Sequence, residues 1–383
     1  MDVARLVESS ITHTGLDDFG GDSFREGLDV LAKSLSEEAE LGDVGRMVAL
    51  GHLRRLLSSR LRVEDCYRQN PEIELEETPA PIFILGLPRT GTTALSTRLA
   101  RDPDTRSLLT WESMHPTPPP EAATRDTDPR IERARSEQEL MYSAFPEMKK
   151  MYDASPTDPT ECQDLLGMEF KTYHFSGQYW APGYAEWVID QDMTSAYRYH
   201  QRTLKLLQWH CPPNRWHLKT PVHMLSLEAL NEVYPDARFI MTHRDPAAVL
   251  GSVCALIQVT RSMASDKRDP KRIGNEQIEF WPLALERAMA FRERIGEDRF
   301  ADVFFTEQLE DPVGVVASAY QKLGLAFIGR VRDEMSAWAQ THQRGRHGSY
   351  TYSLEDYGLN PGHVRERFRS YIDRFVVEME DIR

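Results

Sequence analysis

The sequence predicts an α/β fold, in which a central parallel sheet is flanked by helices and an additional helical segment precedes it. Short apolar runs alternate with stretches compatible with helices, which is the pattern of parallel βαβ units. The chain has 383 residues, more than one simple hydrophobic core usually holds. Hydrophobic residues make up 40% and charged residues 28% of the chain, so the composition is globular.

The N-terminal segment, residues 1–75, is predicted to be helical. Apolar residues recur at three-to-four spacing over residues 24–41 and 44–61, and Asp43 suits an N-cap. The stretch 71–81 is rich in Glu and Pro, which is typical of a linker between structural units. We therefore expect a domain boundary within this stretch.

Residues 76–383 are predicted to form the α/β domain, with helical and aromatic-rich insertions over about residues 113–210. In this domain each strand candidate precedes a helix candidate. The strand candidates are residues 82–85, 216–219, 238–242 and 303–305, and the helix candidates are residues 92–99, 224–234, 247–259 and 312–323.

A loop joins the first strand candidate to the first helix candidate and reads Gly86-Leu87-Pro88-Arg89-Thr90-Gly91-Thr92-Thr93. In this context successive backbone N–H groups and a helix N-terminus can surround an anion. Thr92 stands where nucleoside triphosphatases have a lysine, and Arg89 supplies a cation within the loop instead. A sulfuryl group carries less negative charge than a phosphoryl group, so the loop favours sulfate chemistry. The alternative is a glycine turn with an exposed arginine.

A second anion site is predicted at the strand candidate 238–242. Arg244 follows this strand, and Ser252 lies on the helix that begins after Pro246. Arginine and serine in these places can hold one phosphate from two sides. By itself the pattern is unspecific, because Arg-Asp pairs are common at strand ends.

The bulk properties exclude several classes of protein. The net charge of −14 opposes binding to nucleic acid or to an anionic membrane. No apolar run reaches the roughly 20 residues that cross a bilayer, and the N-terminus has no apolar signal core, which predicts a cytoplasmic protein. No metal site is expected, because the histidines form no H-E-x-x-H pattern and the cysteines have no paired spacing. The cysteines are Cys66, Cys162, Cys211 and Cys254.

Taken together, the two anion sites resemble those of sulfotransferases that use 3′-phosphoadenosine 5′-phosphosulfate (PAPS) and release 3′-phosphoadenosine 5′-phosphate (PAP). The loop resembles the 5′-phosphosulfate element of this family, residues 243–252 resemble its 3′-phosphate element, and residues 305–312 resemble its Tyr-Glu-x-Leu-x-x-Asp-Pro segment. The bacterial branch is the most similar, since Trp111-Glu112 and residues 219–223 also match its pattern. The resemblance covers roughly residues 81–325.

The resemblance implies a P-loop nucleoside-triphosphate-hydrolase-like sulfotransferase fold and in-line transfer of a sulfuryl group to a hydroxyl or amine of a small acceptor. It assigns cofactor binding at the 5′ end to Arg89, Thr90, Gly91, Thr92 and Thr93, and at the 3′ phosphate to Arg244 and Ser252. The Arg-Lys-Gly element of animal relatives is missing. Arg346 lies where it could be replaced, although a solubilising arginine is as good an interpretation.

A base must take the proton of the acceptor. Relatives use either a histidine or a glutamate after the strand that follows the loop, and Glu112 occupies the second kind of place. Desolvation beside Trp111 would raise its pKa toward neutrality, and a capping or salt-bridged glutamate is the alternative. His115 is the second candidate, followed by His217 and His223. Lys219 resembles the lysine that relatives direct at the bridging oxygen of the donor.

The acceptor itself is hard to predict from the sequence. An aromatic cluster in the insertion suits an aromatic or lipidic acceptor, although such clusters are more often core. Its members are Tyr173, His174, Phe175, Tyr179, Trp180, Tyr184 and Trp187. The alternative functions are a P-loop kinase or nucleotide hydrolase, and a non-catalytic nucleotide-binding protein. The oligomeric state and the choice between O- and N-sulfation stay open.

Overall fold

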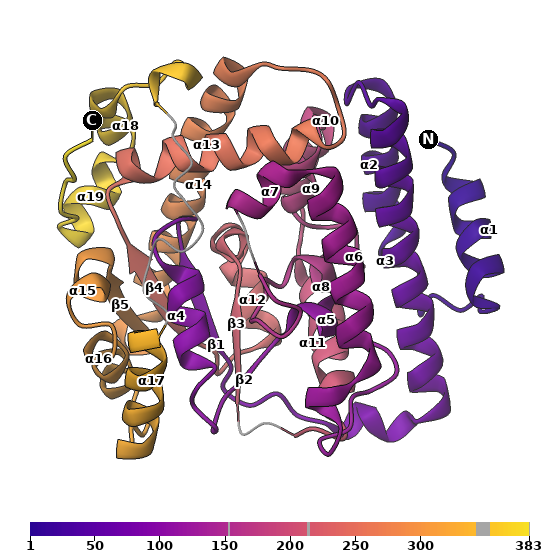
Figure 1. The fold of residues 1–383 in the computed structure, drawn as a ribbon, viewed down its shortest axis with the longest axis horizontal. Coiled ribbons are helices and arrows are strands. Elements are labelled where there is room, and N and C mark those ends of the chain that lie inside the picture. The colour runs from indigo at the N-terminus through magenta and orange to yellow at the C-terminus, as the bar shows by residue number, and fades with distance from the viewer. Residues whose placement is uncertain (152–153, 213–214, 342–352, 383) are drawn as a thin grey trace.

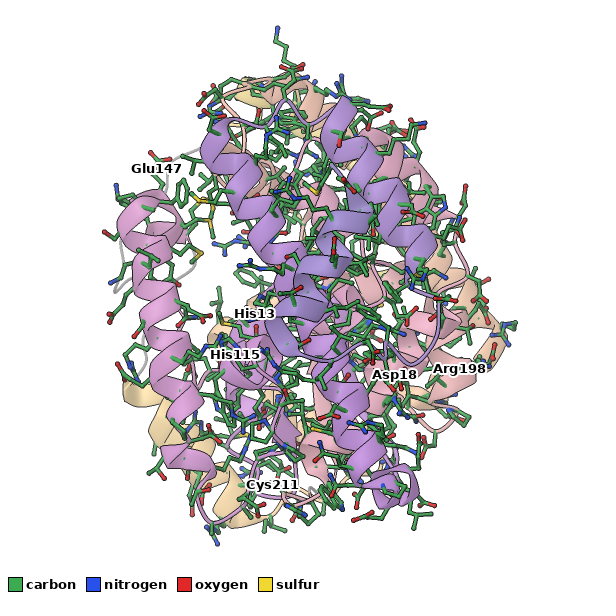
Figure 2. The ribbon with its side chains drawn as sticks, turned by 90° about the vertical axis from the view of Figure 1, so that its right-hand side faces the viewer. His13, Asp18, His115, Glu147, Arg198 and Cys211 are labelled. Atoms are coloured by element: carbon green, nitrogen blue, oxygen red, sulfur yellow. The ribbon has the colours of Figure 1, made fainter. Side chains whose placement is uncertain are left out.

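The N-terminal helices form one side of the molecule (Figure 1). The computed structural model describes residues 1–151, 154–212, 215–341 and 353–382. The first helices are α1 (Val3–Thr14), α2 (Arg25–Glu37) and α3 (Asp43–Gln69). The predicted helical character of this segment is confirmed, although α1 lies outside the two predicted runs, 24–41 and 44–61. The N-cap of α3 is Gly42, and Asp43 is its first helical residue. Figure 2 looks onto α1 and α3, and shows the helix that carries Glu147 at one edge of this face.

Five parallel strands form the central sheet in the order β2-β3-β1-β4-β5. The α/β fold with a parallel sheet flanked by helices is therefore confirmed. The strands are β1 (Ile82–Gly86), β2 (Arg106–Ser107), β3 (Trp216–Lys219), β4 (Arg238–His243) and β5 (Phe300–Phe304). Strand β3 has the predicted bounds, β1 and β4 each extend one residue further, and β5 begins before the predicted 303–305.

Helices fill the connections between the strands (Figure 1). The predicted helix 92–99 is confirmed, whereas the predicted helix 224–234 is a 3₁₀ turn, η3 (Pro221–Leu225), followed by α12 (Leu227–Val233). The other α-helices are α4 (Thr92–Leu99), α5 (Thr110–Met114), α6 (Pro129–Ala144), α7 (Pro146–Met151), α8 (Gln163–Gly167), α9 (His174–Gln178), α10 (Pro182–Ile189), α11 (Thr194–Gln208), α13 (Pro246–Ser262), α14 (Pro270–Ile295), α15 (Phe305–Glu310), α16 (Gly314–Lys322), α17 (Gly329–Thr341), α18 (Pro361–Arg367) and α19 (Arg369–Phe375).

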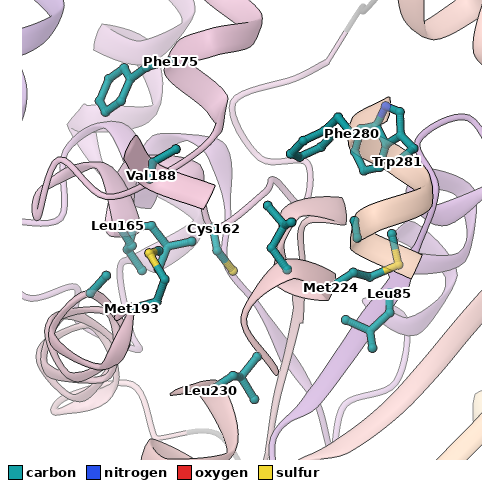
Figure 3. Packing of buried hydrophobic residues seen from close by; sticks show 14 of the residues in the cluster. Leu85, Cys162, Leu165, Phe175, Val188, Met193, Met224, Leu230, Phe280 and Trp281 are labelled. Carbon is teal, nitrogen blue, oxygen red and sulfur yellow. The ribbon is translucent and has the colours of Figure 1, made fainter. Parts of the chain in front are cut away.

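Alternate residues of β1 enter two different hydrophobic clusters, because successive side chains of a strand point to opposite faces of the sheet. Ile82 and Ile84 pack with residues of α4, α16 and α17, whereas Phe83 and Leu85 pack with residues of α11, α13 and α14. Figure 3 shows part of the second cluster, with Leu85, Cys162 and Met224 from different segments of the chain. This cluster extends to the helices α1, α2 and α3, so the boundary after residue 75 stays a prediction.

Strand β1 lies at the centre of the sheet, between β3 and β4. The next two strands in the sequence, β2 and β3, lie on one side of β1, and the last two, β4 and β5, lie on the other side. Ligands of open α/β sheets bind at the carboxyl ends of the strands where the strand order reverses in this way. At this end Gly86 allows β1 to approach β4 closely, since a Cβ on Gly86 would lie 2.3 Å from Thr242 Oγ1. Within the described residues no helix is long and apolar enough to span a membrane.

Acidification below about pH 6.5 is expected to destabilise the protein, because buried neutral histidines take up protons on unfolding. Burial lowers the pKa of His200 and of His217 to about 3. Above that value and below about 6.5 the unfolded state binds the additional protons, so the free energy of unfolding falls by about 1.4 kcal/mol per pH unit for each histidine. Urea unfolding at about pH 7 and about pH 5 measures the loss.

In the variant His200→Gln, the free energy of unfolding should depend less steeply on pH, because one of the two histidines no longer contributes. His13→Gln is the control, because His13 is exposed on α1 (Figure 2) and should leave the dependence unchanged. Equal slopes for His200→Gln and the unchanged protein would show that His200 is not neutral in the folded state.

Candidate active site

The loop after β1 presents backbone N–H groups at the carboxyl edge of the sheet. Arg89 and Gly91 both have left-handed conformations, with φ values of 66° and 89°, which is uncommon for a residue that is not glycine. The Leu95 N–H donates to Gly91 O at 3.0 Å. The preceding N–H groups of Thr92 and Thr93 therefore have no place in the helical ladder of α4 and are available to an anion.

The hydroxyl of Thr90 holds the loop together from inside. It donates to Leu87 O at 2.7 Å and lies 2.6 Å from Thr242 Oγ1 on β4. Gln308, on α15, donates from its side-chain amide to Thr90 O at 3.2 Å. The predicted segment 305–312 thus supports the loop, although the sequence did not identify Gln308 as the residue that does so.

The two predicted anion sites are adjacent. Arg89 Nε donates to Ser252 Oγ on α13 at 3.1 Å, and Arg244 Nη1 donates to Arg89 O at 3.0 Å. The guanidinium of Arg244 also lies on the ring of Phe305, 3.8 Å from its centroid, and pairs with Glu380 near the C-terminus. The structure therefore brings Arg89, Arg244 and Ser252 to one place beside the loop.

Lys219 lies on the other side of the loop, at the end of β3. Its Nζ is 3.5 Å from Thr93 Oγ1 and 3.1 Å from Glu161 Oε1. Glu161 reaches this position because the Cys162 N–H donates to Lys219 O at 3.0 Å, so the chain before α8 runs alongside the end of the strand. The sequence analysis missed Glu161, whose contact with Lys219 depends on this long-range pairing.

Both carboxylate oxygens of Glu161 accept hydrogen bonds, yet the side chain is partly exposed to solvent. Its Oε2 accepts from Thr220 Oγ1 and from Gln163 Nε2, each at 3.2 Å, and its side chain is 31% exposed. Burial by itself would raise the pKa of Glu161, but Lys219 and the hydrogen bonds outweigh it and lower the pKa below its usual range. Glu161 is therefore an ionised carboxylate next to the loop.

Glu112 does not have the environment that the sequence analysis expected. The segment before it is not a strand, because β2 ends at Ser107 and Glu112 lies in the short helix α5. Its side chain is fully buried and accepts from Arg106 at 2.6 Å, from Arg125 at 3.1 Å and from the Leu109 N–H at 3.1 Å. The expected rise of its pKa is wrong. Burial favours a rise, but the two arginines outweigh it and lower the pKa.

The histidine candidates also lie in structural contacts. His115 Nε2 is 3.0 Å from Glu137 Oε2 on α6, and burial lowers its pKa to about 4. His217 lies between Ser96 and Ser107, and His223 Nδ1 is 2.8 Å from the Tyr197 hydroxyl. Among the predicted catalytic residues, only Lys219 contacts the loop through a described bond.

Most of the aromatic cluster belongs to the hydrophobic core, as the alternative interpretation expected. Its buried members are Phe175, Tyr179, Trp180 and Tyr184. His174 is partly exposed, and its pKa is lowered by burial and by His52, against the opposing charge of Glu161. His174 therefore lies within electrostatic range of Glu161.

Two further expectations concern metal and the C-terminal arginine. In the described part of the chain no group of His, Cys, Asp and Glu side chains is arranged to hold a metal ion. Arg346, the third candidate for the 3′ phosphate, lies outside the described residues, and its role stays a prediction.

Comparison with known proteins identifies relatives of this arrangement. A 26% identical segment of 164 residues, 41% of this chain and 40% of the relative, matches an omega-hydroxy-beta-dihydromenaquinone-9 sulfotransferase of Mycobacterium bovis. The solved structure of sulfotransferase STF1 from Mycobacterium tuberculosis superposes with a TM-score of 0.87 and 32% identity, over 97% of this chain and 99% of that chain. Sulfotransferase STF9 from Mycobacterium avium gives a TM-score of 0.92 and 31% identity, over 99% and 98%.

The match to a family model covers the sheet and both anion sites. Residues 81–329 match the model described as the sulfotransferase family. This range begins just before β1 and includes the loop, Lys219, Arg244 and Gln308. The match does not favour the kinase or hydrolase alternative. The chain belongs to the sulfotransferase family.

Proposed function

We propose that this protein transfers the sulfuryl group of PAPS to a hydroxyl or amine of a small acceptor. The observation that supports this most is the convergence of Arg89, Lys219 and Arg244 on one loop at the carboxyl edge of the sheet. Three cations and a helix N-terminus suit a donor with two anionic ends.

The residues present fit such a donor. Arg244 and Ser252 suit the 3′ phosphate, while Arg89, the N–H groups at the start of α4 and the exposed residue Thr93 suit the 5′ end. When bound, PAPS supplies an activated sulfuryl group whose bond to the 5′ phosphate breaks in the reaction. Lys219, next to Thr93, is placed to stabilise the negative charge that then develops on the 5′ side.

In place of Glu112 we propose Glu161 as the base. A base must be unprotonated and within reach of the acceptor, and Glu161 is ionised, partly exposed and paired with Lys219. Glu112 has both oxygens occupied inside the protein. If Lys219 turns toward the donor, its hold on the Glu161 carboxylate weakens and the carboxylate becomes a stronger base.

The acceptor is proposed to be aromatic or lipidic and to enter near Glu161 and His174. The name of the Mycobacterium bovis relative gives an omega-hydroxy-beta-dihydromenaquinone-9 as its acceptor. We further propose that the protein acts in the cytoplasm.

Calorimetric titration with PAP tests the cofactor assignment. We expect micromolar binding without metal, and a loss of about tenfold to a hundredfold in affinity for Arg244→Ala, the size of a lost charge-assisted hydrogen bond. Arg198→Ala is the control, because Arg198 is an exposed residue of α11 (Figure 2) that pairs with Glu232 on α12 and not with the loop. Binding of ATP with magnesium, and none of PAP, would contradict the assignment and favour a kinase.

A further inference from the structure

Arg244 is hydrogen-bonded to Glu380, a residue of the C-terminal segment. Arg244 Nε and Nη2 donate to the two carboxylate oxygens of Glu380, at 2.6 and 2.9 Å. This is the two-bond geometry in which a guanidinium binds a carboxylate most strongly. The pair is only partly exposed, with 20% of the Arg244 side chain and 29% of the Glu380 side chain open to solvent.

The backbone of Glu380 is itself held in place. Its N–H donates to Asp245 Oδ2 at 2.9 Å, and its carbonyl accepts from Arg365 Nη2 at 2.7 Å. Arg365 also donates to Asp245, through Nε at 3.2 Å. Asp245 caps α13 by accepting from the Ala247 N–H at 3.0 Å. The C-terminal segment is thus tied to the same helix start that carries the second anion site.

The contacts of Arg244 leave one pair of donors for a ligand. A guanidinium has five N–H donors, of which two bind Glu380 and one binds Arg89 O. Within the described residues the other two have no acceptor, and they belong to the two terminal nitrogens. Donors on two terminal nitrogens can bind two oxygens of one phosphate. Phe305 supports the flat face of the guanidinium.

We infer that Glu380 is a positioning residue, which holds Arg244 so that its two terminal nitrogens face the 3′ phosphate of the donor. This inference rests on the proposed function. The pairing removes the freedom of a long side chain before the ligand binds, and preorganisation of this kind improves affinity. The nucleotide site then requires the last residues of the chain, which lie far from the loop in the sequence.

The test compares two nucleotides that differ only in the 3′ phosphate, PAP and adenosine 5′-phosphate. For the unchanged protein, calorimetry should give tighter binding of PAP. For Glu380→Ala, we expect PAP affinity to fall by about tenfold, with the affinity for adenosine 5′-phosphate unchanged. The PAP affinity of Glu380→Gln should lie between those of Glu380→Ala and the unchanged protein, because the amide oxygen can accept one of the two hydrogen bonds from Arg244. Glu378→Ala is the matched control, since Glu378 is exposed two residues earlier.

The outcomes separate the inference from the function on which it rests. If the unchanged protein does not bind PAP more tightly than adenosine 5′-phosphate, the proposed cofactor is wrong. If it prefers PAP and Glu380→Ala keeps that preference, Glu380 does not position Arg244. Tighter binding of PAP by Glu380→Ala would also overturn the inference, because it would mean that the carboxylate competes with the 3′ phosphate. A melting temperature close to that of Glu378→Ala excludes loss of folding as the cause.

Discussion

Glu161→Gln is expected to lower kcat by about a hundredfold to ten-thousandfold, the usual contribution of a general base. Glutamine is similar in size and can still accept hydrogen bonds from Thr220 and Gln163, which bind one oxygen of Glu161. It cannot accept a proton from the acceptor. The contacts that bind the 3′ phosphate of PAP should be kept, because no residue assigned to the 3′ phosphate contacts Glu161. Turnover with labelled PAPS and calorimetry with PAP measure the two effects separately.

The control for this variant is Asp164→Asn, which lies three residues after Glu161 on the short helix α8. Asp164 pairs with Arg55 at 2.8 Å and makes no described contact with Lys219. We expect it to lose far less kcat than Glu161→Gln does. The pKa of Glu161 is lowered, so the carboxylate is ionised throughout the neutral range, and its titration should leave turnover unchanged at about pH 6 to 8. Full activity in Glu161→Gln would show that another group is the base.

The parts of the site that the sequence predicted are those built from local pattern. A short apolar strand, a turn with glycines and a helix start are neighbours along the chain, so residues 86–93 identify the loop without knowledge of the fold. Strand β3, which has the predicted bounds, is a short buried segment, Trp216–Lys219, that ends at Lys219. Arg244 and Ser252 were found in the same way, from a strand followed directly by a helix.

Residues that long-range contacts bring together could not be predicted in this way. Glu161 contacts Lys219 across 58 positions of the chain, and Glu380 contacts Arg244 across 136 positions. No local spacing indicates either pairing. Helix α14 also escaped prediction. It includes Pro282, a residue that normally ends a helix because it lacks an N–H donor.

Glu112 shows how a local pattern can suggest a wrong environment. Its place after the loop is similar to that of a catalytic glutamate in relatives, and Trp111 beside it is fully buried. Desolvation alone would raise the pKa of Glu112. The sequence did not indicate that Arg106 and Arg125 would both reach its carboxylate. Two cations at this distance outweigh the desolvation, and the group is held as a buried ion.

Glu112→Gln is therefore expected to lower the free energy of unfolding by about 3 to 5 kcal/mol, the usual effect of breaking a buried ion pair. Arg106 would keep its charge in the interior, where its side chain is only 5% exposed. Its other contacts, the carbonyls of Leu207 and Cys211 at 2.8 and 2.6 Å, are neutral. Urea unfolding measures the loss, and Glu121→Gln, which changes an exposed glutamate, is the control.

A double variant separates this structural role from catalysis. Arg106→Met combined with Glu112→Leu removes the two buried charges, so it should be less destabilised than Glu112→Gln, because the remaining partner, Arg125, has a side chain that is 26% exposed. If Glu112 only supports the fold, the folded fraction of each variant should keep its turnover and its affinity for PAP. A stable Glu112→Gln protein without turnover would instead make Glu112 the base. In that case Glu112 would take the proton of the acceptor. Glu161 would then be a positioning residue, because its carboxylate pairs with Lys219.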